Sequence, residues 1–274
     1  MKILAFGEIL WDVFGEEKKI GGAPFNFAAH AARQGANAFL ISAVGKDVLG
    51  EEALLECTHK GLSTKCIMQT DHQTGRCKVT LNEGMPVYDL SGDMAYDHIL
   101  APKEETDEAD AFYFGTLAQR GDESRRTLYT LLGGKLYKEV FLDINIRQNY
   151  YSDEILEKSI SHATILKISR EEAGVFKIEG SLEDICKKLI EQYENLKLII
   201  VTLDADGAFV YERDGKVTCS DKPSCKVVST VGAGDSFSAA FLVNYLKGET
   251  IETCLRKAAD LASYVCEHME AVPD

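Results

Sequence analysis

The sequence predicts an α/β protein in which a mostly parallel sheet is covered by helices. Segments that are apolar throughout, such as 198–203, alternate with segments of helical periodicity along most of the chain. Strands buried on both faces are continuous apolar runs, and helices supply the crossovers that parallel strands need. The 274 residues are enough for one large domain or two, and no linker, low-complexity tract or internal repeat divides them.

In the first part of the chain, strands and helices alternate. Glu8 and Asp12 lie at the carboxyl end of the first predicted strand, the edge where open α/β sheets bind ligands, with solvated surface acids as the alternative. Pro24 suits a first helical turn, and Asn26 offers a donor and an acceptor to a ligand, with a local cap as its alternative role. The predicted strand, helix, strand and helix cover residues 2–10, 24–35, 38–44 and 48–59.

A run of short strands interrupts the alternation. Residues 66–70, 76–81 and 87–90 each have strand character, and Asn82-Glu83-Gly84 is a turn. No helix separates the last two strands, so they are predicted to pair antiparallel. The pattern indicates a small sheet standing off the main one, a candidate lid.

Regular alternation resumes afterwards. The predicted strands cover 111–114, 139–144, 164–168 and 198–203. The predicted helices between them cover 123–132, 153–161 and 182–193. A hairpin over 209–211 and 216–218 precedes a glycine turn, a helix that begins at Asp235 and a final helix over 251–268.

The glycine turn is the strongest chemical motif. Gly232 and Gly234 allow a tight turn and a close ligand approach, and the helix that follows aims unpaired N–H groups and its positive dipole end at one point. Such a point binds an anion, most often phosphate. Asp235 would repel that anion unless it has chemistry to perform, and the economical role is a base for an attacking hydroxyl. The alternative is an ordinary turn with Asp235 as a helix cap.

Composition excludes several classes of partner and site. The net charge of −14 argues against nucleic acid and anionic membranes, and no apolar run has membrane-spanning length. The eight cysteines lack C-x-x-C spacing, which indicates reduced thiols and a cytoplasmic protein. The six histidines show no metal-binding spacing, so each is predicted to be solvated or part of the core.

Several motifs occur in order along the whole chain. They are Gly7-Glu8 with Asp12, GGAPFNFAAHAARQG at 21–35, VGKDVLG at 44–50, FGTLAQR at 114–120, DINIR at 143–147 and TVGAGDSF at 230–237. Together they resemble the ribokinase (PfkB) family of carbohydrate kinases, and within it the fructokinases. The resemblance implies a single ribokinase-like domain over 1–274. Its fold would be a doubly wound sheet with a small β lid formed by about 12–20 and 66–96.

The resemblance also implies roles for individual residues. It makes Asp235 the general base, and Gly232, Ala233 and Gly234 the anion hole. The implied sugar ligands are Asp12, Gly22, Asn26 and Asp235, with Gln119 and Arg120 closing the sugar pocket. The implied nucleotide residues are Asn145, Arg147, Ser169, Thr202, Asp204 and Gly207, with Glu172 reaching Mg²⁺ through water.

The chain departs from the family pattern on the nucleotide side. Ser229 replaces an aspartate that helps to hold a monovalent cation, which predicts activity nearly indifferent to K⁺. Ser169 replaces the asparagine of the family's N-x-x-E element. Asp204 and Glu270 stand where the family has glycine. These changes leave open whether the rate of phosphoryl transfer is reduced and which phosphoryl donor is used.

The expected function is transfer of the γ-phosphoryl group of ATP, with Mg²⁺, to the primary hydroxyl of a monosaccharide, most simply fructose to give fructose 6-phosphate. A kinase for ribose or 2-keto-3-deoxygluconate is an alternative, as is a sugar-binding regulatory or scaffold protein with weakened catalysis. A dinucleotide-dependent oxidoreductase is disfavoured, because no G-x-G-x-x-G follows the first strand. In some family members two lids clasp to form a dimer, which makes a homodimer through the lid an option here.

Overall fold

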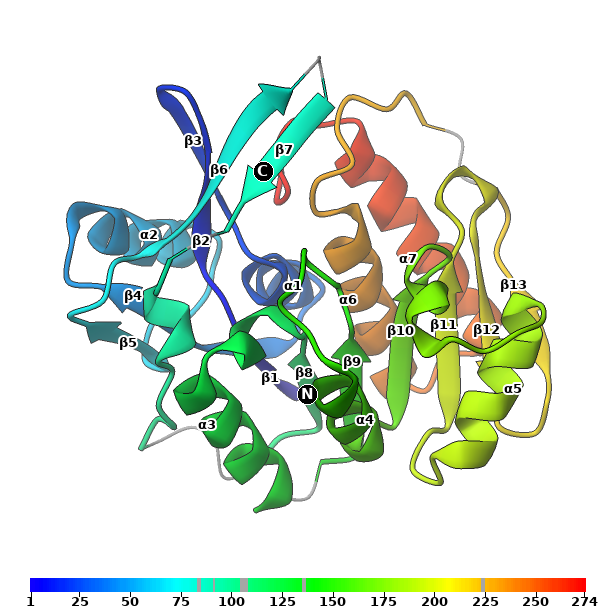
Figure 1. Cartoon of the computed structure of the whole chain (residues 1–274). Coiled ribbons are helices and arrows are strands. Elements are labelled where there is room, and N and C mark those ends of the chain that lie inside the picture. The colour runs from blue at the N-terminus through cyan, green and yellow to red at the C-terminus, as the bar shows by residue number, and fades with distance from the viewer. Residues whose placement is uncertain (83–84, 91, 104–107, 135–136, 223–224) are drawn as a thin grey trace.

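The computed structural model describes residues 1–82, 85–90, 92–103, 108–134, 137–222 and 225–274. In this part of the chain the strands form a nine-stranded sheet and a separate four-stranded sheet (Figure 1). The nine-stranded order is β13-β12-β11-β10-β9-β8-β1-β4-β5, and the neighbours from β11 to β5 run parallel. The α/β class predicted from the sequence is confirmed.

The strands of the large sheet follow the predicted ones closely. β12 and β13 form the antiparallel hairpin at one edge. The bounds are β1 Lys2–Phe6, β4 Asn37–Gly45, β5 Ile67–Thr70, β8 Ala111–Phe114, β9 Glu139–Asp143, β10 Ile165–Ser169, β11 Leu198–Thr202, β12 Ala208–Glu212 and β13 Val217–Cys219.

Helices cover both faces of this sheet, as the figure shows (Figure 1). One layer consists of α1 Ala23–Arg33, α2 Val48–His59, α6 Ala233–Leu246 and α7 Ile251–Cys266. The other consists of α3 Asp122–Gly133, α4 Asp153–His162 and α5 Leu182–Gln192. Short 3₁₀ turns are η1 Ala95–Asp97, η2 Leu117–Arg120, η3 Glu172–Phe176 and η4 Asp204–Asp206.

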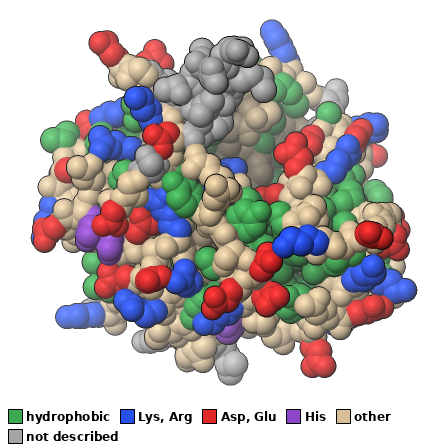
Figure 2. Space-filling model, viewed as in Figure 1, with side chains coloured by type: hydrophobic (Ala, Val, Ile, Leu, Met, Phe, Trp, Pro, Cys, Tyr) green, Lys and Arg blue, Asp and Glu red, His purple; other side chains and the backbone are tan. Residues whose placement is uncertain are grey.

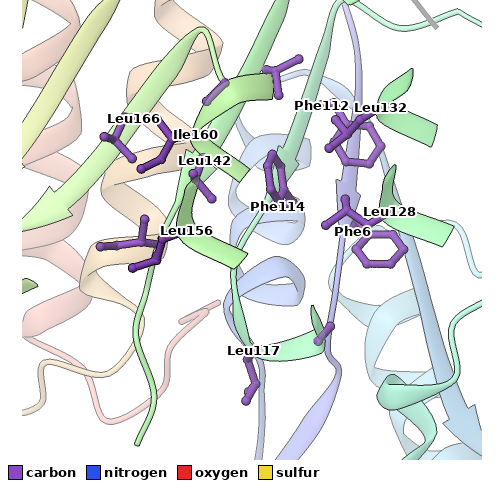
Figure 3. Close-up of a cluster of buried hydrophobic side chains, with 14 of the residues drawn as sticks. Phe6, Phe112, Phe114, Leu117, Leu128, Leu132, Leu142, Leu156, Ile160 and Leu166 are labelled. Atoms are coloured by element: carbon purple, nitrogen blue, oxygen red, sulfur yellow. The ribbon is translucent and has the colours of Figure 1, made fainter. Parts of the chain in front are cut away.

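The central strands are apolar throughout because each of their faces lies in a different core. In β1, Leu4 and Phe6 belong to one core, whereas Ile3 and Ala5 belong to the other. Figure 3 shows the first of these cores, in which rings of β1 and β8 pack against leucines of α3. Burying side chains of this size stabilises the fold by about 1.5–3 kcal/mol each. This two-sided burial holds the carboxyl ends of the parallel strands in a fixed frame.

The four-stranded sheet stands off the large one, at the top of the view (Figure 1). Its order is β3-β2-β6-β7, with β2 and β6 parallel and the two outer pairs antiparallel. The bounds are β2 Leu10–Phe14, β3 Glu17–Gly21, β6 Gly75–Asn82 and β7 Met85–Asp89.

Two strand predictions were wrong. Residues 66–70 were expected in the small sheet, but β5 pairs in parallel with β4 as an edge strand of the large sheet. The strand expected over 2–10 is two strands, because the chain turns at Gly7. Gly7 has φ +143°, and a Cβ there would lie 2.5 Å from Cγ of Pro24, so the chain leaves β1 before it enters β2.

Two further findings concern membrane-spanning helices and the state of the cysteines. No helix in the described ranges is both long enough and apolar enough to cross a membrane. All eight cysteines are free thiols.

Candidate active site

The turn before α6 is built around Gly232. Its φ is +79°, and a Cβ there would lie 2.6 Å from Cβ of Ala271, so the position requires glycine both for its conformation and for space. Ser229 shapes the approach, because its Oγ accepts a hydrogen bond from the N–H of Val231 at 3.2 Å. The N–H of Ala233 donates to the carbonyl of Thr230 at 3.3 Å within the turn itself, and the helix N-terminus that begins here is of the kind that binds an anion.

Asp235 lies in the first turn of α6 and is partly accessible. Burial raises its pKa to about 6; the hydrogen bond from Asn26 opposes this shift, the charge of Asp143 adds to it, and the charges of Lys167 and Arg147 oppose it. The Nδ2 of Asn26 donates to Oδ2 of Asp235 at 2.8 Å. This partner comes from α1 and not from the backbone of α6, which favours a base over a helix cap. A carboxyl with a pKa near 6 is ionised at neutral pH and still basic enough to take a proton.

Asn26 has an unused hydrogen-bond acceptor. The residue is 4 % exposed, and in the described structure its Oδ1 is buried without a partner. Buried amide oxygens are normally paired, so this atom fits a ligand hydroxyl. Gly22 precedes the helix with φ +109°, and a Cβ there would lie 2.4 Å from the carbonyl oxygen of Glu8, so the turn packs directly on that residue.

Two acidic residues lie beside this turn. Glu8 is 5 % exposed and accepts a hydrogen bond from the N–H of Ala23 at 3.2 Å, so the solvated-surface alternative is wrong for it. Burial raises the pKa of Glu8 to about 7. Burial also raises the pKa of Asp12 in β2, against the opposing effects of a hydrogen bond with Cys77 and the charge of Arg147.

Arg147 lies near all the acids of the cluster. Its charge lowers the pKa of Glu8, Asp12 and Asp235, although burial outweighs it in each case. The side chain is exposed and follows β9 in a loop where Asn145 has φ +40°. An exposed guanidinium near several carboxylates is a natural ligand for phosphate oxygens.

Glu172 and Ser169 hold this loop in place. The Oε1 of Glu172 accepts from the N–H of Ile146 and its Oε2 from the N–H of Ser169, both at 2.8 Å. The Oγ of Ser169 accepts from the N–H of Glu172 at 3.1 Å, so serine serves as a local cap where the family has asparagine. Each carboxylate oxygen of Glu172 keeps a free lone pair, which fits a metal-bound water.

A buried ion pair beneath the turn was not predicted from the sequence. Nζ of Lys167 lies 2.7 Å from Oδ2 of Asp143, and Oγ of Ser238 donates to the same oxygen at 3.0 Å. Lys167 is 5 % exposed and Asp143 is 1 % exposed. The ammonium is 3.5 Å from where a Cβ of Gly234 would stand, so a fixed positive charge lies directly behind the turn. The sign of this pair in the sequence was Lys167 itself, a lysine within an otherwise apolar strand.

The loop after β11 carries the expected nucleotide residues. Thr202 ends the strand, and Gly207 turns the chain into β12 with φ +93°. Asp204 has φ +53°, the left-handed conformation that explains the glycine usual in the family and that aspartate tolerates. Arg170 ties the loop to β10, because its N–H donates to the carbonyl of Thr202 at 2.9 Å and its guanidinium pairs with Asp206 at 2.8 Å.

Gln119 and Arg120 are not part of this cluster. The side-chain amide of Gln119 bonds to Gly115, Ser159 and Tyr129, on the side of the sheet covered by α3 and α4. Arg120 makes a two-pronged contact with Asp97, at 2.8 and 2.9 Å. These contacts are made within the chain, and the closure of a sugar pocket by these two residues stays a prediction.

Arg120 instead anchors the chain that leaves the small sheet. Its guanidinium donates to the carbonyls of Leu90 and Gly92 at 2.6 and 2.9 Å, and it stacks between the rings of Tyr96 and Tyr150. Its effect on a ligand site would be indirect, through the placing of the segment after β7.

The remaining expected residues come from loops at the carboxyl ends of the parallel strands and from the small sheet. Asp12 lies in the small sheet, Asn26 in α1, Arg147 after β9 and Asp235 in α6. On the face that Figure 2 shows, the surface is hollowed between the region of the small sheet and the rest of the molecule. The arrangement can hold a hydroxyl compound beside a base and an anion beside a helix N-terminus.

Comparison with known proteins fits this arrangement. The model of the pfkB family of carbohydrate kinases matches residues 2–274. An ATP-dependent 6-phosphofructokinase of Thermoanaerobacterium thermosaccharolyticum is 25 % identical over 297 residues, which cover 99 % of this chain and 90 % of that protein.

Solved structures have the same fold. The fructokinase of Vibrio cholerae O395, bound to fructose, ADP and calcium, superposes with a TM-score of 0.86 at 20 % identity, covering 99 % of this chain and 94 % of the other. The sugar kinase PH1459 of Pyrococcus horikoshii in complex with ATP gives a TM-score of 0.84 at 26 % identity, covering 98 % and 94 %. The fold is therefore ribokinase-like, and the chain belongs to the pfkB family of carbohydrate kinases.

Proposed function

We propose that this kinase transfers the γ-phosphoryl group of ATP to the primary hydroxyl of fructose and releases fructose 6-phosphate. The observation that carries the proposal is the pair formed by Asn26 and Asp235. A base with a pKa near 6 lies beside a buried, unpartnered amide oxygen, at the N-terminus of a helix. This combination suits a hydroxyl that must be oriented, deprotonated and brought to a phosphate.

The roles follow from position. Asn26 and Asp12 orient the sugar, and Asp235 accepts the hydroxyl proton during attack on phosphorus. The first-turn N–H groups of α6 stabilise the charge on the transferred group, and the ammonium of Lys167 behind them strengthens that field. Arg147 binds phosphate oxygens through its planar donors.

The nucleotide side is proposed from the loops that meet there. Asn145, Thr202, Asp204 and Gly207 would line the ATP site, and Glu172 would reach Mg²⁺ through water. The ion supplies neutralisation of phosphate charge. The small sheet would act as a lid that keeps water away from the reaction, and two lids could pair in a homodimer.

A coupled assay of ADP release tests the substrate. The panel comprises fructose, fructose 6-phosphate, ribose, 2-keto-3-deoxygluconate and nucleosides, each with saturating ATP and Mg²⁺. Fructose should give the highest kcat/KM. Fructose 6-phosphate is included because a relative bears the name 6-phosphofructokinase. A higher value for another member of the panel would contradict the choice of fructose, and a folded protein without turnover on any of them would contradict the kinase role.

The departures at Ser169, Asp204 and Ser229 support one competing candidate, a sugar-binding protein with little catalysis. Calorimetry separates the two. Binding of both fructose and Mg²⁺–ATP supports the kinase, whereas sugar binding without nucleotide binding supports the competitor. The free thiols fit the cytoplasmic location that we propose.

A further inference from the structure

Two histidines outside the proposed active site share one aspartate. Nε2 of His98 lies 2.6 Å from Oδ1 of Asp93, and Nδ1 of His72 lies 3.3 Å from Oδ2 of the same residue. The two imidazole rings are stacked, with centroids 3.5 Å apart and an angle of 11° between their planes. On the face in Figure 2, histidines gather with charged side chains on the flank where β5 and α2 lie. The cluster was not predicted from the sequence, because 25 residues separate His72 from His98 along the chain.

We propose that His72, Asp93 and His98 form a binding site for a divalent transition-metal ion, with Zn²⁺ as the first choice. One nitrogen or carboxylate oxygen from each residue lies within 4.8 Å of the others. Two imidazoles and a carboxylate are ligands that Zn²⁺ accepts, with a fourth position left to water. Metal–ligand distances of about 2.0–2.2 Å require the ligand atoms to draw together, and a shared ion must lie in the plane of each imidazole, so the stacked rings must also tilt apart. His72 and His98 are partly exposed, which leaves room for both changes.

The surroundings orient His98 as a metal ligand. Its Nδ1 lies 3.0 Å from Oε2 of Glu123, so in the tautomer with the proton on Nδ1 this nitrogen donates to Glu123 and Nε2 keeps its lone pair for a metal beside Asp93. A carboxylate behind the imidazole is the usual support of a metal-bound histidine. Arg120 holds the backbone of the same segment through the carbonyl of Gly92. The side of Asp93 and His98 opens to a depression of about 710 Å³, through which an ion can enter.

Protons compete with the metal for these ligands. Two protonated rings stacked face to face would repel each other, whereas one divalent ion neutralises the carboxylate and joins both rings. Metal affinity should therefore increase with pH.

The site would brace the small sheet. His72 precedes β6, and Asp93 follows β7, so the ligands lie on two of the chain segments that join this sheet to the rest of the molecule. A bridge between Gln73 and Met94 already pairs these segments beside the cluster, and the N–H of Ala95 donates to the carbonyl of Gln73 at 2.8 Å. A metal here would fasten the base of the proposed lid. This inference does not depend on which sugar is bound or on whether the chain is an active kinase.

Calorimetric titration of metal-free protein without a polyhistidine tag tests the site. The parent should bind one Zn²⁺ per chain at pH 7.5, in the presence of excess Mg²⁺. His98→Gln and His72→Gln should each weaken binding by at least about 100-fold, and Glu123→Gln by about 10-fold or more. The matched control is His59→Gln, which alters an exposed histidine beside a single carboxylate, Glu56 at 3.6 Å, and should bind as the parent does.

Two outcomes would overturn the proposal. One is a parent without a Zn²⁺ site, and the other is a site that survives both substitutions. Co²⁺ in place of Zn²⁺ identifies a site that survives both substitutions, because a thiolate-to-metal charge-transfer band would place the ion on cysteine. Circular dichroism of each variant confirms that it is folded, so that loss of binding reports the ligands.

Hydrogen exchange tests the bracing role separately. Zn²⁺ should slow amide exchange in 71–75 and 92–98 of the parent and leave it unchanged in His98→Gln. Binding without slower exchange in these segments would contradict the bracing role while leaving the metal site itself supported.

Discussion

Replacing Asp235 with asparagine should make the protein more stable and much less active. The native state raises the pKa of this carboxyl from 3.8 to about 6, chiefly through burial. The ionised form that catalysis needs is therefore the form that the fold tolerates least. Asp235→Asn keeps the shape and stays neutral, so it removes this penalty. It also removes the proposed base, and turnover should fall by roughly 10²- to 10⁴-fold.

The expected gain in the free energy of unfolding follows from the shift in the pKa of Asp235. About two pKa units correspond to about 3 kcal/mol, and partial access to water reduces the expected value to about 1–2 kcal/mol. The raised pKa means that the native state holds its proton more tightly than the unfolded chain does. The penalty is therefore absent below pH about 4, grows between pH 4 and 6, and is complete above that range. The advantage of Asp235→Asn should be about half as large at pH 5 as at pH 8.

Urea unfolding of parent and variant at pH 5 and pH 8 measures both values. Asp260→Asn is the control, because Asp260 is an exposed acid paired with Arg256 at 3.4 Å on α7 and should change stability little at either pH. A variant no more stable than the parent at pH 8 would refute the argument from burial. Turnover equal to that of the parent would return Asp235 to the role of a structural residue.

Three further predictions concern neighbouring residues. Asn26→Leu removes the hydrogen bond that opposes the raised pKa of Asp235, so the acid limb of the kcat/KM profile should move above pH 6. The KM for the sugar should also increase. An acid limb that does not move would contradict the link between Asn26 and the pKa of Asp235. Lys167→Met leaves Asp143 buried and unpaired, so the free energy of unfolding should fall by about 3–5 kcal/mol in a denaturant titration, with partial recovery when Asp143→Leu is added. Activity should be nearly indifferent to replacement of K⁺ by a large organic cation at fixed ionic strength, and Ser229→Asp should create K⁺ dependence. Strong activation of the parent by K⁺ would show that other ligands suffice to bind K⁺ without a carboxylate at position 229.

The sequence predicted most of the elements because local rules determine them. Helix α2 has the expected bounds, and its start is set by Asp47, whose Oδ1 accepts from the N–H of Gly50 at 2.8 Å. The turn before α6 was also predicted from the sequence, because its conformation and its tight packing require glycine at position 232. In both cases the deciding interaction lies within a few residues or follows from the backbone itself.

What the sequence missed depends on contacts between distant segments. The strand at β5 is too short to reveal its partner, and β4 lies in a different part of the chain. The partners of Gln119 come from α3 and α4, and those of Lys167 from β9. Periodicity carries no information about such pairs. A lysine in the middle of an apolar strand was the one local sign that a buried partner existed.

The packing of Gly232 against Ala271 has a consequence for how the enzyme is made. Ala271 and Val272 are almost fully buried, and the carbonyl of Ala271 accepts a hydrogen bond from Nε2 of His30 at 2.8 Å. The turn that is proposed to bind phosphate thus rests on residues translated after every helix and strand described above. A nascent chain that has already assembled its sheet on the ribosome still lacks the support of this turn. The turn therefore completes its packing later in synthesis than the sheet does.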